Sequence, residues 1–486
     1  MTDQSVSTRS QMYWSTLLKI PTQAAAFVLS LIVARILMPG DYGVMGVAMM
    51  LIGFANLFTD FGFSSAIVQK QIKDEDTLRS IFTFNFAVST ALAVLFSLSA
   101  RFIAEFFKSA DCKNVVIVMS SFFVITSFSA VPRAILRRDL DFKTLSLVDT
   151  GGAILMGVVT LLLALAHFRY WALALGQLLP TVVTTLYVCI HVRWLPVVAY
   201  KHSSMKHIVD FGFWNVLKTQ LEFALGQIDK MFLGRFAGLV ALGYYDKAMS
   251  IAAVPSESYI ASLSGVLFSS FSQRRDDREE LRNLFKRGLM MISVLSFPVY
   301  IGLFIVARYF VVGLLGTKWS PMIVPFEIIA VSYSLRSIGR FLVSVNVGIG
   351  EYKAYTVRYF VAGCVFVVLC ALLVGYGTSG IAIAFLVFSV LYVALGLQLA
   401  IRALDLGWAD VLGVCWPAAK ATACMLAVTG LLSFALAGRT LVNLFAISVA
   451  GAIVYTSCLA METNPGFVVL RKLAVADVTK ILRRNQ

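Results

Sequence analysis

Residues 208–236 read IVDFGFWNVLKTQLEFALGQIDKMFLGRF, an apolar stretch long enough to cross a lipid bilayer. Asn215, Lys218, Glu222 and Asp229 recur in it at spacings that share one helical face, within about 60° of one another at 100° per residue. An ionisable side chain inside a membrane span is costly, and such residues normally face a bundle interior or a watery cavity. The stretch therefore predicts a transmembrane helix that presents a polar stripe to a chamber in the membrane.

The composition of the whole chain extends this interpretation. Of its 486 residues 59% are hydrophobic and 14% are charged, with a mean hydropathy of +0.84, whereas soluble domains have about 25% charged residues. The sequence predicts an all-α integral membrane protein. Windows of about 20 residues give about fourteen transmembrane helices, near residues 13–38, 42–66, 80–100, 115–132, 146–166, 170–191, 208–234, 243–270, 288–315, 322–347, 355–376, 380–402, 413–437 and 440–461.

The distribution of Lys and Arg predicts the topology. These residues account for the net charge of +15 and concentrate in alternate loops. The positive-inside rule therefore places both termini of a multi-pass membrane protein in the cytoplasm. Lys19 and Pro21 interrupt the first apolar segment and no small-residue cleavage pattern follows, so we expect no cleaved signal peptide. The basic loops are 68–80, 133–144, 192–207, 273–287 and 348–358, together with the tail from residue 462.

The chain contains an internal repeat. At an offset of 200, Arg35, Gly43, Ala48 and Met49 align with Arg235, Gly243, Ala248 and Met249; at an offset of 210, Phe142-Lys143 aligns with Tyr352-Lys353, and residues 171–174 align with 381–384. A six-span period with the same topology is typical of transporters that bind substrate between their halves. We therefore expect two pseudo-symmetric six-helix lobes around a central cavity. The predicted domains are an N-terminal lobe at 1–200, a C-terminal lobe at 201–405, two extra C-terminal helices at 406–462, and a cytoplasmic amphipathic tail at 463–486.

Charged and polar residues in three other spans are candidates to line the chamber with the stripe. Arg336 and Arg340 lie four residues apart in the tenth span, and their planar donor forks suit phosphate or carboxylate oxygens. The first two spans add Lys19, Gln23 and Asn56. In the alternative interpretation these groups pair with one another, as Lys218 and Glu222 could at i,i+4, and only hold helices together. The predicted substrate-binding set is Lys19, Gln23, Asn56, Asn215, Lys218, Glu222, Arg336 and Arg340.

A second group of charges flanks the end of the seventh span and the start of the eighth. Asp229, Arg235, Asp246 and Lys247 form this group. An ion-pair network that fixes the hairpin explains them at least as well as ligand contact does, so we predict a structural role. Three further carboxylates, Asp149, Glu257 and Glu327, are candidates to carry protons or sodium ions if transport is coupled to an ion gradient.

Several functional classes are disfavoured by the sequence. The seven cysteines and four histidines have no metal-ligand spacing, so we predict neither a metal site nor a cofactor. The longest strongly polar run, 273–287, is too short for a soluble catalytic domain, so we expect no enzymatic activity. The basic loops are explained by topology, and a nucleic-acid partner is not expected.

Four runs of sequence resemble a known family: DKMFLGRFAGLVALGYYDKAM from Asp229, DFGFSSAIVQKQ from Asp60, RAILRRDLDFK from Arg133 and VLFSSFSQRRDDREELRNLFKRG from Val266. They are similar to the polysaccharide transport branch, with its Wzx-type flippases, of the multidrug/oligosaccharidyl-lipid/polysaccharide exporter superfamily. The resemblance implies two six-helix lobes around a V-shaped cavity with alternating access. It also implies export of undecaprenyl-diphosphate-linked oligosaccharide repeat units from the cytoplasmic to the periplasmic leaflet, for exopolysaccharide, capsule or lipopolysaccharide synthesis.

The expected partners follow from this resemblance: the lipid-linked oligosaccharide, membrane lipids, H⁺ or Na⁺ as coupling ion, and the polymerase and glycosyltransferases of the same pathway. The two extra spans could form a groove for the polyprenyl tail or a pair that stabilises a lobe. One alternative is a flippase for the peptidoglycan lipid precursor, which shares the basic cavity. Another is an ion-coupled drug exporter of the same superfamily, for which carboxylates rather than Lys19, Arg336 and Arg340 would be expected in the chamber. A membrane-embedded polymerase or glycosyltransferase would need an extracytoplasmic loop or catalytic acid that the chain lacks.

Overall fold

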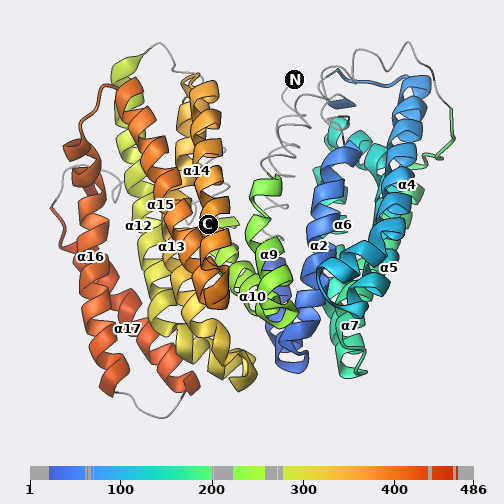
Figure 1. The fold of residues 1–486 in the computed structure, drawn as a ribbon. Coiled ribbons are helices and arrows are strands. Elements are labelled where there is room, and N and C mark those ends of the chain that lie inside the picture. The colour runs from blue at the N-terminus through green and yellow to red at the C-terminus, as the bar shows by residue number, and fades with distance from the viewer. Residues whose placement is uncertain are drawn as a thin grey trace, which may run out of the picture. The chain divides into compact units, whose positions relative to one another are not determined.

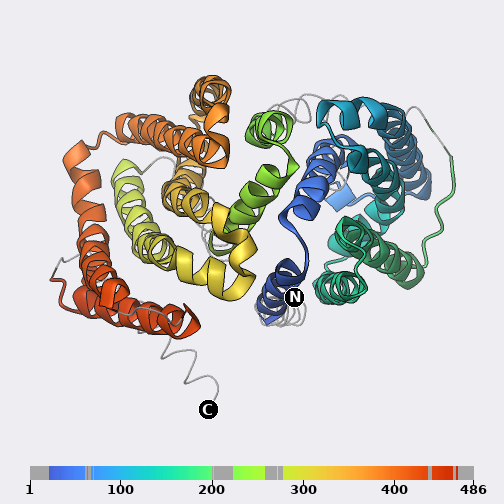
Figure 2. The same cartoon turned by 60° about the horizontal axis from the view of Figure 1, so that its bottom comes forward.

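The computed structural model describes residues 21–60, 63, 67–68, 70–199, 201, 223–257, 271, 277–435, 440–463 and 467–468. All regular secondary structure in these ranges is helical, which confirms the predicted all-α class. The chain forms two compact units, Met1–Asp246 and Lys247–Gln486. Figure 1 labels the helices of both units, and Figure 2 shows the same ribbon turned by 60°.

The first unit is built from long helices that pack pairwise. In it α4 packs on α5, α6 packs on α7, and α5 also contacts α7 and α2. The short α9 continues directly into a π-helical segment, η1, and α10 begins in this unit and ends in the second. The helices are Pro21–Ile36, α2 (Pro39–Asp60), α4 (Glu75–Phe106), α5 (Ala110–Arg138), α6 (Phe142–Leu165), α7 (Tyr170–Val192), α9 (Ile228–Phe232), η1 (Leu233–Ala237) and α10 (Leu239–Pro255).

The second unit repeats this packing scheme. Here α12 packs on α13, α14 packs on α15, and α13 also contacts α15, while α16 and α17 pack on each other and on α12. The elements are α12 (Arg278–Phe310), η3 (Val311–Leu315), η4 (Thr317–Met322), α13 (Ile323–Gly348), α14 (Tyr352–Leu373), η5 (Val374–Tyr376), α15 (Gly377–Ala403), α16 (Trp408–Ala435) and α17 (Thr440–Ala460).

Nine segments of the described residues are long and apolar enough to cross a membrane. One of them, Tyr352–Ala403, contains both α14 and α15. Helices suit this environment because they satisfy every backbone hydrogen bond within the segment. The chain is therefore a multi-pass membrane protein, and the total of about fourteen spans stays a prediction.

Two glycines mark the contact between the start of the second repeat and the first. A Cβ atom placed on Gly43 of α2 would collide with the carbonyl oxygen of Leu239 on α10, and one placed on Gly243 would collide with the carbonyl oxygen of Pro39. Gly243 lies 200 positions after Gly43, and Leu239 lies 200 positions after Pro39, so the contact is reciprocal. Glycine lets the two backbones approach this closely. The crossing explains why the start of α10 belongs to the first compact unit although the repeat places it in the second lobe; the lobe boundaries themselves stay a prediction.

Equivalent turns and helix caps recur in the two halves. Asp74 caps α4 by accepting a hydrogen bond from the amide of Thr77 at 2.9 Å, and Asp277 caps α12 by accepting one from Glu280 at 3.0 Å. Each satisfies an amide that has no partner within its helix. The α5–α6 turn places Leu140 at a φ of 59°, and the α13–α14 turn places Gly350 at 94°, again 210 residues later. The repeat thus extends to backbone conformation.

Candidate functional site

Arg336 lies on α13, half-buried against the aromatic surface of α15. Its guanidinium carbon is 5.0 Å from the ring centroid of Phe385, 5.7 Å from that of Phe388 and 6.0 Å from that of Tyr392. A guanidinium over an aromatic face gains about 0.5–2 kcal/mol from the negative face of the ring. The rings leave the positive charge and the N–H donors of the guanidinium available, and no carboxylate among the described residues forms an ion pair with Arg336.

The rings beneath Arg336 belong to a larger aromatic cluster that connects α14 and α15. The hydroxyl of Tyr355 donates a 2.6 Å hydrogen bond to the hydroxyl of Tyr392, and Tyr359 packs edge-on against Tyr392 at 5.7 Å. Phe388 stacks on Phe366 at 4.8 Å. These contacts hold the rings in place, so Arg336 is oriented by a packed surface rather than by a flexible counter-ion. We call Phe385, Phe388, Tyr392, Tyr355 and Tyr359 the aromatic shelf.

Arg340 lies one turn further along α13, and its contacts with the described residues are long. It donates to the carbonyl oxygen of Ser256 at 3.4 Å, and its guanidinium lies 3.8 Å from the carboxylate of Glu257. The side chains of Arg340 and Glu257 are 39% and 67% exposed. An exposed ion pair contributes about 0–1 kcal/mol. The hydroxyl of Ser256 is buried and has no hydrogen-bond partner among the described residues. A better anionic ligand could therefore replace Glu257 beside Arg340.

The remaining predicted substrate-binding residues are only partly visible. Gln23 is exposed on the helix Pro21–Ile36. Asn56 lies on α2, but its side chain is outside the described residues, as are Lys19, Asn215, Lys218 and Glu222. Of the predicted residues whose side chains are described, the structure thus brings together Arg336 and Arg340, and the chamber stripe of the seventh span stays a prediction.

The charges around η1 each have an identifiable partner or environment. Asp229 is 1% exposed and accepts a 2.7 Å hydrogen bond from the hydroxyl of Tyr245. Asp246 pairs with Lys230 at 2.6 Å, a contact that ties α9 to α10. Lys247 is buried at the start of the second unit. The contacts of Asp229 and Asp246 thus join α9 to α10.

Arg235 connects η1 to the end of α4. It donates to the carbonyl oxygen of Phe106 at 2.7 Å and lies 5.3 Å from the centroid of that ring. The last carbonyl groups of a helix have no partners within it and carry partial negative charge, so a cation stabilises them. Arg235 thus caps the C-terminus of α4.

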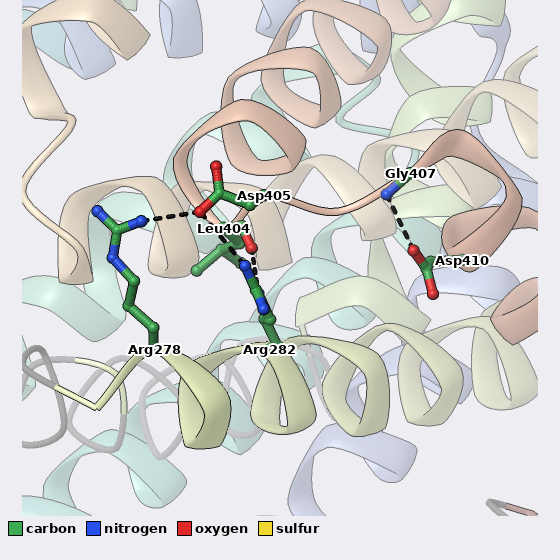
Figure 3. Close-up of polar contacts among 6 residues, drawn as sticks. All are labelled: Arg278, Arg282, Leu404, Asp405, Gly407 and Asp410. Atoms are coloured by element: carbon green, nitrogen blue, oxygen red, sulfur yellow. Dashed lines mark hydrogen bonds and ion pairs between the residues drawn. The ribbon is translucent and has the colours of Figure 1, made fainter.

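An ion-pair cluster that sequence reasoning missed joins α12 to the α15–α16 turn (Figure 3). Arg278 and Arg282 pair with Asp405 at 2.8 and 3.3 Å, and Arg282 also donates to the carbonyl oxygen of Leu404 at 2.6 Å. One turn further on, Lys286 pairs with Asp410 at 2.7 Å. The cations follow one another at i,i+4 on α12, a spacing visible in the sequence. We call this cluster the α12 clamp.

Comparisons with known proteins agree with the fold. The family model described as polysaccharide biosynthesis protein matches residues 32–324. The lipopolysaccharide biosynthesis protein WzxC of Escherichia coli (strain K12) is 26% identical over 332 residues, 67% of each chain. The succinoglycan biosynthesis transport protein ExoT of Rhizobium meliloti (strain 1021) is 27% identical over 63% of this chain and 62% of its own. The solved structure of the lipid II flippase MurJ in an inward closed conformation has a TM-score of 0.75 and 14% identity, and covers 96% of this chain and 100% of its own.

Proposed function

Because the chain belongs to the polysaccharide biosynthesis protein family, we propose that it is a flippase for undecaprenyl-diphosphate-linked oligosaccharide repeat units. It moves them from the cytoplasmic to the periplasmic leaflet by alternating access, and the repeat units then enter exopolysaccharide, capsule or lipopolysaccharide synthesis. The names of WzxC and ExoT connect those relatives with polysaccharide synthesis, and ExoT with its transport. The chain also shares its fold with the lipid II flippase MurJ.

The observation that carries the proposal is the state of Arg336. A cation inside a membrane span costs several kcal/mol when it has no compensating partner, and the described residues give Arg336 rings instead of a carboxylate. A diphosphate supplies the missing negative charge, and the guanidinium fork binds two of its oxygens at once. Arg340, whose contacts among the described residues are long ones to the Ser256 carbonyl and the exposed Glu257, adds a second cation one helical turn away.

The aromatic shelf supports a sugar-bearing substrate. Aromatic faces attract the C–H surfaces of sugar rings, and tyrosine hydroxyls exchange hydrogen bonds with sugar hydroxyls. Three of the five shelf residues are tyrosines, and two of these already share a hydrogen bond. Phe385, Phe388 and Tyr355 are buried in the cluster, so Tyr359 and Tyr392, which are half-buried, are the shelf residues that would meet a sugar beside Arg336. The cationic character of α13 also favours this substrate over the cationic amphiphiles of a drug exporter.

In this proposal the protein lies in the bacterial inner membrane with both termini in the cytoplasm, as the Lys and Arg distribution predicts. It binds and releases its substrate without altering it chemically, so we expect no catalysis. A proton or sodium gradient is the proposed driving force, and the pathway's polymerase and glycosyltransferases are its proposed partners.

The test is a deletion strain complemented with variants that still reach the membrane. Loss of the gene should cause undecaprenyl-linked repeat units to accumulate on the cytoplasmic side. Arg336→Gln and Arg340→Gln should each restore export poorly, whereas Arg308→Gln, which removes an exposed arginine at the end of α12, should restore it fully. No accumulation in the deletion strain would contradict the flippase function. Full export by both Arg336→Gln and Arg340→Gln would contradict the proposal that α13 binds the diphosphate.

A further inference from the structure

An open apolar groove runs between α6 and α7 in the first unit. Its volume is about 620 Å³, and its walls include Leu147, Leu155 and Val158 of α6 and Val183 and Tyr187 of α7. Leu147, Val183 and Tyr187 are about half exposed. A volume in this range is typical of ligand sites. The groove is therefore large enough to hold an extended chain rather than a single methyl group.

Two glycines on α6 leave this groove open. The equivalent positions of the second repeat are not glycines. Gly151 and Gly152 line it on α6, and a Cβ atom placed on Gly151 would have no atom within 4 Å. At the offset of 210, the second half has Val361 and Ala362 in these positions, and Ala362 is 1% exposed. The α14 helix thus carries side chains at the positions equivalent to Gly151 and Gly152. The open space beside α6 is therefore specific to the first half.

One end of the groove is cationic. Lys143, Leu147, Gly151 and Leu155 succeed one another at i,i+4 and therefore share one face of α6. Lys143 lies in the basic 133–144 loop region, is exposed and forms no ion pair among the described residues. From Lys143 to Val158 the face is roughly 22 Å long at 1.5 Å per residue, and beyond the lysine it is apolar.

At the same end, α7 contributes two stacked rings. His191 stacks on Tyr187 with ring centroids 5.8 Å apart. Its Nε2 lies 3.9 Å from the carboxylate of Asp141 and 3.5 Å from the hydroxyl of Thr144. Asp141 is itself engaged as the cap of α6, accepting a hydrogen bond from the amide of Thr144 at 3.0 Å. The carboxylate at this end therefore has partners of its own, and Lys143 is an exposed cation beside it that forms no ion pair among the described residues.

We infer that this groove holds the polyprenyl chain of the lipid-linked substrate, with the diphosphate beside Lys143 at the cytoplasmic membrane surface. The inference rests on the proposed function and adds a site for the tail to the α13 site for the head group. A polyprenyl diphosphate has a single apolar chain that ends in a compact anion. That pattern matches one groove with one cationic end, whereas a phospholipid brings two chains. The groove then selects the substrate in the cytoplasmic leaflet before the head group enters the transport path.

The test measures binding of undecaprenyl diphosphate and of inorganic diphosphate to the purified full-length protein in detergent. Gly151→Phe adds a ring to the groove wall at a position where an added Cβ meets no atom within 4 Å. It should weaken undecaprenyl diphosphate binding about tenfold, because it removes two or three carbons from apolar contact. Inorganic diphosphate binding should not change. Gly413→Phe is the matched control, since Gly413 on α16 also has no atom within 4 Å of an added Cβ; it should bind both ligands like the wild type.

A second pair of variants tests the cationic end. Lys143→Gln should weaken binding of undecaprenyl diphosphate but not of undecaprenol, which lacks the anion. Lys353→Gln changes the exposed repeat counterpart of Lys143 and should change neither. Thermal unfolding checks that all four variants are folded.

Three results would overturn the inference. Gly151→Phe could bind undecaprenyl diphosphate like the wild type, or both phenylalanine variants could lose affinity equally; either result places the chain elsewhere. Alternatively, a bilayer phospholipid could displace undecaprenyl diphosphate from the wild type at equal concentration, which would make the groove a contact for ordinary membrane lipid. A wild type that binds undecaprenyl diphosphate no better than inorganic diphosphate would contradict the proposed function as well.

Discussion

The guanidinium carbon of Arg336 lies 5.0 Å from the ring centroid of Phe385, and the described residues hold this arginine by rings alone. The arrangement fixes the direction of the cation without neutralising it. A carboxylate in the same place would have to be displaced before an anionic substrate could bind, at the cost of breaking an ion pair. The aromatic shelf avoids that competition.

Replacing Arg336 should separate charge from geometry. Arg336→Gln removes the charge-assisted hydrogen bonds to the diphosphate, each worth about 1.5–3 kcal/mol, and should slow translocation in proteoliposomes about tenfold to a hundredfold. Arg336→Lys keeps the charge but loses the planar fork and should fall between glutamine and the wild type. Equal rates for Gln and the wild type would exclude a role in transport for Arg336.

The contact between Arg336 and Phe385 should also be measurable as a coupling energy. In a double-mutant cycle with Arg336→Gln and Phe385→Leu, the effects on substrate affinity should be non-additive by about 0.5–2 kcal/mol, the range of a cation–π contact. A matched cycle with Arg308→Gln and Phe385→Leu should be additive, because Arg308 is exposed on α12. Additivity in the first cycle would mean that the rings do not orient the arginine.

The glycine crossing should tolerate no side chain. Gly43→Ala and Gly243→Ala each direct a methyl group into a backbone carbonyl of the other helix, which cannot rotate away. We expect each to lower the free energy of unfolding by about 1–3 kcal/mol, and the double variant to cost less than the sum, because one separation of the helices relieves both. Thermal unfolding checks this, with Gly413→Ala as the control in open space. If Gly43→Ala and Gly243→Ala were as stable as Gly413→Ala, the close approach of the α2 and α10 backbones would be contradicted.

The turn in the α12 clamp should respond to backbone conformation and to charge separately. Asp405 has a φ of 48°, in the left-handed region. Asp405→Gly removes the ion pairs with Arg278 and Arg282 but suits this conformation, whereas Asp405→Ala removes the same pairs and adds strain of about 1–2 kcal/mol. The alanine variant should therefore be less stable than the glycine variant. High salt should lower the stability of the wild type but of neither variant, because it screens the ion pairs. Equal stability of the alanine and glycine variants would show that the turn is not strained.

The cap of α4 should make its first turn sensitive to acid. The hydroxyl and amide of Thr77 hydrogen-bond the carboxylate of Asp74 and lower its pKa below the usual value. A carboxyl with a lowered folded-state pKa contributes stability above its unfolded pKa and loses it as the pH falls through the folded value. Amide hydrogen exchange at 75–78 should thus accelerate in the wild type below about pH 4. Asp74→Asn, which also caps helices, should abolish that pH dependence, and its persistence would assign the effect to another group.

The sequence predicted helices well wherever the apolar pattern alone defines them. The expected span at 170–191 is α7, Tyr170–Val192, and that at 440–461 is α17, Thr440–Ala460. Helices with polar ends run further than the apolar windows: α4 begins at Glu75 and α12 at Arg278, because aspartate caps and charged first turns extend the helix into water. Hydropathy contains no signal for such extensions.

Part of the candidate site could also be predicted from the sequence. The i,i+4 spacing of Arg336 and Arg340 placed them correctly on one helix. The aromatic shelf was missed, although Phe385, Phe388 and Tyr392 recur at i,i+3,i+7 and so share a face of α15. What periodicity cannot supply is which helix faces which. The contacts of Arg336 with α15, and of Arg340 with Glu257, depend on packing between elements far apart in the chain.

The reciprocal contact at Gly43 and Gly243 has a consequence for the history of the chain. A contact in which equivalent residues of two repeats face each other about a two-fold axis is the interface of a homodimer. Two copies of a single-repeat protein with this glycine could associate through α2 in the same way. Fusion of the two genes would then make the association intramolecular and permanent. Each glycine accommodates the other repeat's backbone, so a side chain at either position would disturb both halves at once, whereas α6 and α14 differ in sequence at Gly151 and Val361.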